Sequence, residues 1–223
     1  MLPWKYPGLL MRAFYPGAIF RGDPTGGRIY LTFDDGPHPE VTPRLLGVLK
    51  NAGIRATFFV IYRREMWWGE ILRQAASDGH AICLHGMQHR GAYLKTNPAL
   101  HGELIELEGH VEEQNVAPVR LFRPPFGHVR PDSVDYLRRR GIPTVLWSSI
   151  PGDFRPTAPL ALFHRAAKNL APGSIVALHD GTNLRPAPVL ELTGMLLDYI
   201  TQKGWQAAPL DADPRPLDSG MTR

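Results

Sequence analysis

The sequence contains only one cysteine, Cys83, so an internal disulfide bond is excluded. Cys83 lies in the apolar run 81–84, where a lone cysteine is typical of a small buried core residue. The fold must therefore be held together by its hydrophobic core. Apolar residues make up 43% of the 223-residue chain, which is enough for a core of ordinary size.

Long hydrophobic runs are also missing. The first 21 residues are rich in apolar side chains, but they are interrupted by Pro3, Lys5, Pro7, Arg12 and Pro16. This segment lacks the continuous apolar core of a signal peptide and the ~20 apolar residues of a membrane span. We therefore expect no transmembrane segment and an extension at residues 1–28 that packs on the domain. The cellular location is left open; with no signal peptide evident, the sequence favours a cytoplasmic or peripherally membrane-associated protein.

The chain has no strong excess of charge and no low-complexity linker. Its formal net charge is +4, and its basic residues are scattered without interleaved aromatic side chains, so we expect no nucleic-acid partner. At ~150 residues per domain the length allows one or two domains. The missing linker favours a single domain at residues 29–210, followed by a loose, polar, proline-rich tail at 211–223.

Short apolar runs alternate with amphipathic segments along the chain, a pattern typical of repeated β-α units. Strands are predicted at residues 28–33, 56–61, 80–85, 119–123, 143–147, 174–179 and 205–210, with helices between them. Strict alternation predicts a parallel sheet, and a closed barrel explains the pattern at least as well as an open sheet. The first strand is not followed by a glycine-rich phosphate motif, which argues against a dinucleotide-binding fold.

Polar side chains collect where the predicted strands end. They are Asp34 and Asp35, His85 and His89, Arg123, Trp147 and Asp153, and His179 and Asp180. The carboxyl ends of parallel strands form the catalytic face of a barrel and the ligand side of an open α/β sheet. The sequence therefore predicts that these residues share one site.

Adjacent carboxylates at Asp34 and Asp35 repel each other, and a divalent cation would keep both ionised. One aspartate together with His85 and His89 supplies three ligands and leaves a fourth position open. Three protein ligands and an open position are typical of a catalytic zinc site. The spacing therefore predicts a metal centre on this rim.

The motifs in which these residues lie resemble those of the polysaccharide deacetylase family, carbohydrate esterase family 4, which is related to nodulation chitooligosaccharide deacetylases. The matching segments are "LTFDDGP", "LHGMQH", "FRPPFG", "ALHDG" and, in part, "WSSIPGDF". The resemblance extends over residues 29–210. It implies a distorted (β/α)7 barrel of parallel strands that removes an N- or O-acyl group, usually acetyl, from a sugar with the help of a metal.

The resemblance also assigns roles to individual residues. It implies that Asp34 is the general base and His179 the general acid, and that Asp35, His85 and His89 bind one divalent ion. It further implies that Arg123 pairs with Asp34 and that the Asp153 carboxylate orients His179. The N–H of Phe126 would contact the oxyanion, and Trp147, Ala177 and Leu178 would line the pocket. Zinc is the expected ion, and cobalt or nickel would fit the same ligands.

Four positions depart from the family pattern. Ile150 stands where aspartate is usual, Phe154 where tryptophan is usual, Gly86 where serine or threonine is usual, and Ala177 where leucine is usual. Ala177 shares a strand face with His179. The smaller side chain predicts a wider acyl pocket, or a pocket walled by another residue. His128 follows the arginine motif and is a candidate substrate contact.

Two alternative functions stay open beside carbohydrate deacylation. One is hydrolysis of a C–N bond in a small amide or cyclic imide on the same fold, and the other is a non-catalytic carbohydrate-binding barrel. The chain keeps all three metal ligands, Asp34 and His179, which favours the deacylase. The expected substrate is an amino-sugar polymer, oligomer or glycolipid; the oligomeric state is left open.

Overall fold

The computed structural model describes residues 9–181 and 186–211, and its core is a parallel sheet. Its strands are β1 (Arg28–Asp34), β2 (Thr57–Ile61), β3 (Ala81–Gly86), β4 (Ile175–His179) and β5 (Gln206–Ala207). They are ordered β3-β2-β1-β4, and β5 pairs with the first residues of β1. Every pairing is parallel, as the alternation of the sequence predicts.

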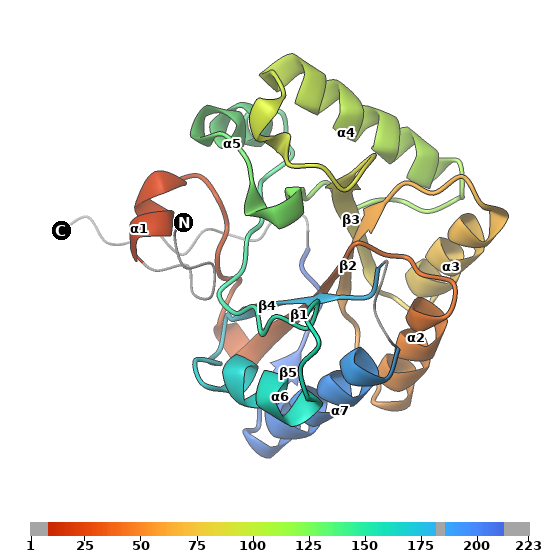
Figure 1. Ribbon diagram of the computed structural model, residues 1–223, viewed down its shortest axis with the longest axis vertical. Helices are drawn as coiled ribbons and strands as arrows, with labels where there is room; N and C mark the ends of the chain where they lie inside the picture. The colour runs from red at the N-terminus through yellow and green to blue at the C-terminus, as the bar shows by residue number, and fades with distance from the viewer. Residues whose placement is uncertain (1–8, 182–185, 212–223) are drawn as a thin grey trace.

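Helices surround the strands on the outside (Figure 1). They are α1 (Leu9–Phe14), α2 (Val41–Asn51), α3 (Met66–Ser77), α4 (Asn97–Glu112), α5 (Pro131–Arg138), α6 (Pro159–Ala167) and α7 (Pro186–Gln202), with short 3-10 helices η1 (Thr25–Gly27), η2 (Ala92–Leu94) and η3 (Pro125–Gly127). The long helices turn apolar stripes inward, so that the buried residues of α4 are Leu100, Leu104, Leu107 and Val111.

Single backbone bridges, rather than ladders, close the ring on the side opposite β1. Parallel bridges join Leu84 to Phe122, Phe122 to Thr144, and Ser149 to Val176 of β4. The predicted barrel class is confirmed, and the barrel is distorted here. The prediction of regular strands at 119–123 and 143–147 is wrong. Proline has no N–H for a ladder; Pro118, Pro124 and Pro125 flank the first segment, and Pro143 begins the second.

The segment before β1 takes part in this closure. Ile19 forms a parallel bridge with Val145, donates its N–H to the carbonyl of Thr144, and accepts from the N–H of Leu146. Ile19 and Phe20 are buried in the core. Residues 1–8 of the predicted extension and 212–223 of the predicted tail lie outside the described residues, and the boundary at residue 29 stays a prediction.

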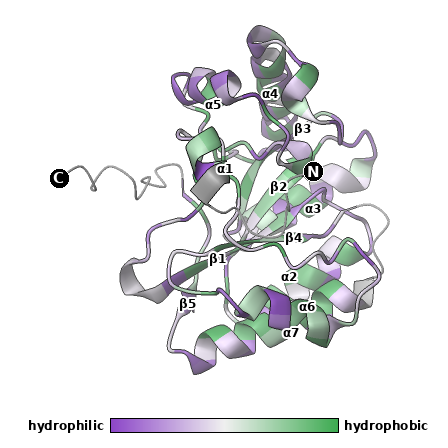
Figure 2. Cartoon of the chain, turned by 60° about the vertical axis from the view of Figure 1, so that its left-hand side comes forward, coloured by the Kyte–Doolittle hydropathy of each residue, from purple (hydrophilic) through white to green (hydrophobic). Residues whose placement is uncertain are grey.

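The strands are buried on both faces, as expected for parallel strands covered by helices. Residues 29–34 of β1 are all buried, and Figure 2 shows hydrophobic colour concentrated on the central strands. Cys83 is fully buried, and this burial raises the pKa of its thiol. Among the described residues, no helix combines the length and the hydropathy needed to cross a membrane.

Candidate active site

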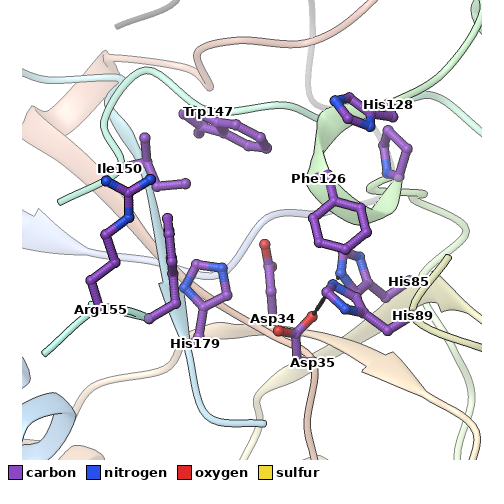
Figure 3. A pocket seen from close by; sticks show the side chains of 12 residues that line it. Asp34, Asp35, His85, His89, Phe126, His128, Trp147, Ile150, Arg155 and His179 are labelled. Carbon is purple, nitrogen blue, oxygen red and sulfur yellow. Dashed lines mark hydrogen bonds and ion pairs between the residues drawn. The ribbon is translucent and has the colours of Figure 1, made fainter. Parts of the chain in front are cut away.

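A pocket of about 370 Å³ opens at the carboxyl ends of the strands. Its lining residues are Asp34, Asp35, His85, His89, Pro124, Phe126, His128, Trp147, Ile150, Phe154, Arg155 and His179. Figure 3 shows His85 and His89 on one side, His179 on the other, and the two aspartates between them. The structure therefore brings together residues that the sequence places on β1, β3, β4 and the loops between Arg123 and Arg155.

Asp35, His85 and His89 point at one another and could together hold a metal ion, as the sequence predicts. Asp35 Oδ1 lies 3.1 Å from His85 Nε2 and 3.0 Å from His89 Nε2. Zinc–ligand bonds of 2.0–2.2 Å in a tetrahedron place neighbouring ligand atoms about 3.3 Å apart. The three atoms are therefore spaced as the ligands of a single small cation would be.

The hydrogen bonds of His85 show that its Nε2 is suited to a cation. Its Nδ1 lies 2.6 Å from the carbonyl oxygen of Arg123, so that nitrogen carries the proton. In a neutral imidazole the lone pair of Nε2 then faces the Asp35 carboxylate, and two acceptors 3.1 Å apart repel each other unless a metal ion or a proton lies between them. Burial opposes ionisation of Asp35, but the contacts with His85 and His89 outweigh it and hold its pKa far below the usual range.

Glu103 on α4 holds both ends of the loop that carries His89. Its Oε1 accepts a hydrogen bond from the N–H of Met87 at 3.0 Å, and its Oε2 pairs with Lys95. Gly86 has a φ of 123°, and a Cβ there would lie only 3.3 Å from Glu103 Oε1. The residue that departs from the family pattern thus leaves room for this carboxylate. Sequence reasoning missed Glu103 because an acidic residue on an amphipathic helix usually belongs to the solvated face.

Asp34 is held by the buried guanidinium of Arg123. Arg123 Nη1 donates to Asp34 Oδ1 at 2.7 Å and to Thr32 Oγ1 at 2.6 Å, while Nη2 donates to the carbonyl of Leu146 at 3.0 Å. The guanidinium also lies 4.1 Å from the ring centre of Phe59. Asp34 Oδ2 has no hydrogen-bond partner within the described ranges, so this oxygen is available at the pocket.

His179 and Asp153 form a second pair of titratable groups at the site. Asp153 Oδ1 lies 2.9 Å from His179 Nδ1, and Asp153 Oδ2 accepts the backbone N–H of His179 at 2.8 Å. Burial disfavours the charged imidazolium, but the Asp153 carboxylate outweighs it and raises the pKa of His179 to about 9. His179 is therefore protonated at neutral pH and can donate a proton from its other ring nitrogen.

Comparison with known proteins agrees with this arrangement. The sequence model of polysaccharide deacetylases matches residues 21–145. The chain belongs to the polysaccharide deacetylase family. It is 34% identical over 176 residues to a peptidoglycan-N-acetylglucosamine deacetylase of Bacillus cereus, which covers 78% of this chain and 82% of that relative. It is 33% identical over 167 residues to a chitooligosaccharide deacetylase of Azorhizobium caulinodans, with 74% and 80% covered.

Solved structures share the fold of this polysaccharide deacetylase. A crystal structure of a peptidoglycan N-acetylglucosamine deacetylase aligns with a TM-score of 0.83 and 22% identity, covering 92% of this chain and 95% of that one. A carbohydrate esterase family 4 pseudoenzyme of Bacillus anthracis aligns with a TM-score of 0.78 and 22% identity, covering 87% and 68%. The fold thus occurs with and without activity, and the residues of the site decide between the two.

Two non-glycine residues of the polysaccharide deacetylase site have left-handed backbone conformations. Asp35 has a φ of 72° and Phe126 a φ of 59°, each at a cost of about 1–2 kcal/mol. Such strain is tolerated where the surroundings fix the chain. A Cβ on Gly181 would collide with Asp35, so the glycine that ends the last motif allows the turn at Asp35 to lie against the end of β4.

Asp180 packs against the same turn at Gly36, a structural role that the sequence did not predict. Its Oδ2 accepts a hydrogen bond from Thr42 Oγ1 at 2.5 Å, and a Cβ on Gly36 would collide with its carboxylate. Burial raises the pKa of Asp180 to about 7, although the hydroxyl of Thr42 opposes the rise. Its Oδ1 is buried and has no partner in the described part of the chain.

Aromatic and aliphatic side chains from the irregular half form the outer wall. The Phe126 ring lies 4.3 Å from the ring centre of His89 and the Phe154 ring 5.1 Å from that of His179. The predicted candidates Trp147 and His128 also line the pocket. Ala177 and Leu178 are fully buried and are not among the lining residues. The wider acyl pocket therefore stays a prediction, with Ile150 and Trp147 as the walls that could replace a side chain at 177.

Proposed function

We propose that this polysaccharide deacetylase is metal-dependent and removes N-acetyl groups from an amino-sugar glycan, with peptidoglycan and chitooligosaccharides as the first candidates. The named relatives support this range of substrates. The single observation that carries the proposal is geometric. The ligand group of Asp35, the carboxylate of Asp34 and the imidazole of His179 all line one pocket.

Asp35, His85 and His89 would hold the ion, and two imidazoles with one carboxylate suit zinc, with cobalt or nickel as alternatives. A divalent ion there would polarise the acyl carbonyl and make the attacking water more acidic. The described residues contribute three ligand atoms within 4.8 Å of one another, which leaves room for a substrate oxygen and water.

Asp34 acts as the general base. Arg123 fixes Oδ1, and the unpartnered Oδ2 takes the proton of the water that attacks the acyl carbon. Arg123 in turn is held by Thr32, Leu146 and Asp34 together, so the carboxylate cannot rotate freely. This rigidity orients the base before the substrate arrives.

His179 acts as the general acid and gives its proton to the leaving amine nitrogen of the sugar. Asp153 holds the imidazole through Nδ1 and stabilises its charged form. The backbone N–H of Phe126, on the strained turn of η3, contributes to the stabilisation of the developing oxyanion. Each step thus uses a side chain or backbone group of this chain in a fixed orientation.

An acetate-release assay tests the proposal. The purified protein is stripped with a chelator, divided, and supplied with zinc, cobalt, nickel or buffer, and each portion is offered peptidoglycan and chitin oligomers. We expect release only with metal, and a fall of about 10²–10⁴-fold in Asp34→Asn. Release that neither chelation nor Asp34→Asn reduces would overturn the mechanism.

The same assay addresses the two alternatives. A small amide or cyclic-imide hydrolase would show metal-dependent turnover of those compounds and none of glycans. A non-catalytic barrel would bind glycans but release no acetate, whichever metal is supplied. The complete set of Asp34, His179 and the three ligands favours catalysis, because a binding module has no use for a base and an acid on opposite sides of one pocket.

A further inference from the structure

Arg155 lines the pocket and has no acidic partner. It is exposed, and Figure 3 shows it on the side of His179, away from His85 and His89. No carboxylate of residues 9–181 and 186–211 pairs with its guanidinium. Several other surface arginines pair with a carboxylate close by in the sequence, as Arg130 does with Asp132.

The carboxylates of the site are already engaged. The pairs are Asp34 with Arg123, Asp35 with His85 and His89, and Asp153 with His179. A second guanidinium supports the same loop, since Arg165 donates to the carbonyl of Pro151 at 3.3 Å. This side of the pocket therefore has uncompensated positive charge that can interact with a substrate.

Arg155 lies one aromatic ring away from the proposed proton donor. The Phe154 ring meets the His179 ring edge-on, at 5.1 Å and 77°. The Arg155 Cζ lies 5.5 Å from the centre of the same Phe154 ring. A sugar whose scissile nitrogen faces His179 thus presents its adjoining substituents along Phe154 towards the guanidinium.

Ile150 and Arg155 line the same side of the pocket (Figure 3). An aliphatic side chain cannot pair with the guanidinium. The wall thus combines a cation with apolar surface from Ile150, Trp147 and Phe154, which suits a sugar ring that carries one anionic group.

We propose that Arg155 recognises a carboxylate substituent on the glycan, beside the acylated sugar. The planar guanidinium offers a pair of parallel N–H donors that match a carboxylate. This inference rests on the proposed function and narrows it, because it favours glycans with acidic sugars over neutral chitooligosaccharides. The guanidinium is solvent-exposed, so its effect is moderate and decreases with ionic strength.

Matched tetrasaccharides test the assignment. One alternates N-acetylglucosamine with N-acetylmuramic acid, the second is the same molecule with each carboxylate converted to a carboxamide, and the third is neutral N-acetylchitotetraose. Wild-type protein, Arg155→Gln and Arg44→Gln are compared in acetate release. Arg44 is exposed on α2 and does not line the pocket, so its substitution removes the same charge elsewhere.

We expect the wild-type protein and Arg44→Gln to show a KM about 5- to 10-fold lower for the carboxylate than for the carboxamide. Arg155→Gln should lose this difference, with KM for both neutral substrates unchanged. Equal KM values for carboxylate and carboxamide in the wild-type protein, or an equal loss on all three substrates in Arg155→Gln, would overturn the inference alone. Acetate release from none of the three would overturn the proposed function and this inference with it.

A phosphate-bearing probe separates the two sources of negative charge. N-acetylglucosamine 1-phosphate carries its charge beside the sugar, as the headgroup of a glycolipid does. If Arg155→Gln raises the KM for this probe but not the KM for the carboxylate tetrasaccharide, the assignment to a carboxylate is contradicted. A preference for the carboxylate tetrasaccharide alone would support it.

Discussion

The two halves of the barrel differ in regularity and in what they supply. The half built from β1, β2, β3 and β4 is a continuous parallel ladder, and its strands carry Asp34, His85 and His179 where they end. The other half, residues 119–155, is joined by single bridges and supplies Phe126, Trp147 and Arg155. The ladder carries the charged groups of the reaction, and the irregular half carries most of the wall against which a substrate would lie.

The difference teaches how one fold can keep its chemistry and change its substrate. Atoms on a ladder are positioned by many shared hydrogen bonds, so Asp34, His85 and His179 keep fixed distances. Atoms on a segment with few ladder bonds can be changed with less effect on the core. Arg123 and Asp153 are the exceptions, because both come from the irregular half and pair with residues of the ladder half, Arg123 with Asp34 and Asp153 with His179.

The largest expected effect comes from the ladder half. Asp34→Asn keeps the shape and the hydrogen bond to Arg123 but removes the base, so kcat falls by about 10²–10⁴-fold with KM within a factor of about three. Steady-state kinetics on N-acetylchitotetraose measure it. If kcat/KM falls by the same factor but the whole change comes from a higher KM, Asp34 contributes to substrate binding and is not the general base.

The next effect tests the link between the halves. Arg123→Gln leaves the Asp34 carboxylate buried and unpaired, and we expect a loss of about 3–5 kcal/mol in the free energy of unfolding. Urea denaturation at pH 7 measures it. Arg130→Gln, which breaks an exposed pair with Asp132, is the control, and we expect it to leave the free energy of unfolding nearly unchanged. Equal losses in the two variants would contradict the structural role of the buried pair.

A smaller effect is expected at the loop that carries His89. Glu103→Ala releases the N–H of Met87 and the ammonium of Lys95, and we expect zinc affinity to fall by about 10- to 100-fold. Competition with a chelating dye measures affinity without turnover. Glu106→Ala, exposed on the same helix, should leave affinity unchanged; an equal fall in both would remove the special role of Glu103.

A shift in pH dependence should follow from Asp153→Asn. The proposed acid works only while His179 is protonated, so the rate falls as pH rises through its pKa of about 9. Without the Asp153 carboxylate the pKa of His179 falls, because burial still opposes the charged imidazolium and only the weaker effects of Asp34 and Asp35 still favour it. The alkaline limb of the kcat profile should therefore move to lower pH. An unchanged limb would show that another group sets it.

The sequence predicted most of the residues that meet in the pocket. Asp35, His85 and His89 are close in the structure because each follows a strand whose carboxyl end reaches the same rim. Asp153 lies beside His179, 26 positions further along the chain, because the segment before Asp153 joins β4 through the bridge from Ser149 to Val176. In a parallel sheet, motifs that are far apart in the sequence end at the same rim. Their residues therefore become neighbours, which is why the sequence motifs predicted which residues meet here.

The sequence could not predict the supports and the irregular wall. Glu103 lies on α4, where one acidic residue looks like another until its neighbours are known. The segments 119–123 and 143–147 have the composition of strands, yet their flanking prolines limit them to single bridges. The pairing of Thr42 with Asp180 joins residues 138 positions apart, and neither motif contains a signal for it.

The measurement that tests the central claim most directly is anomalous diffraction at the zinc edge from crystals grown with excess zinc. The account predicts one strong peak per chain, about 2.0–2.2 Å from an oxygen of Asp35 and from Nε2 of His85 and His89. Absence of a peak at this position, with the three side chains pointing to separate places, would contradict it.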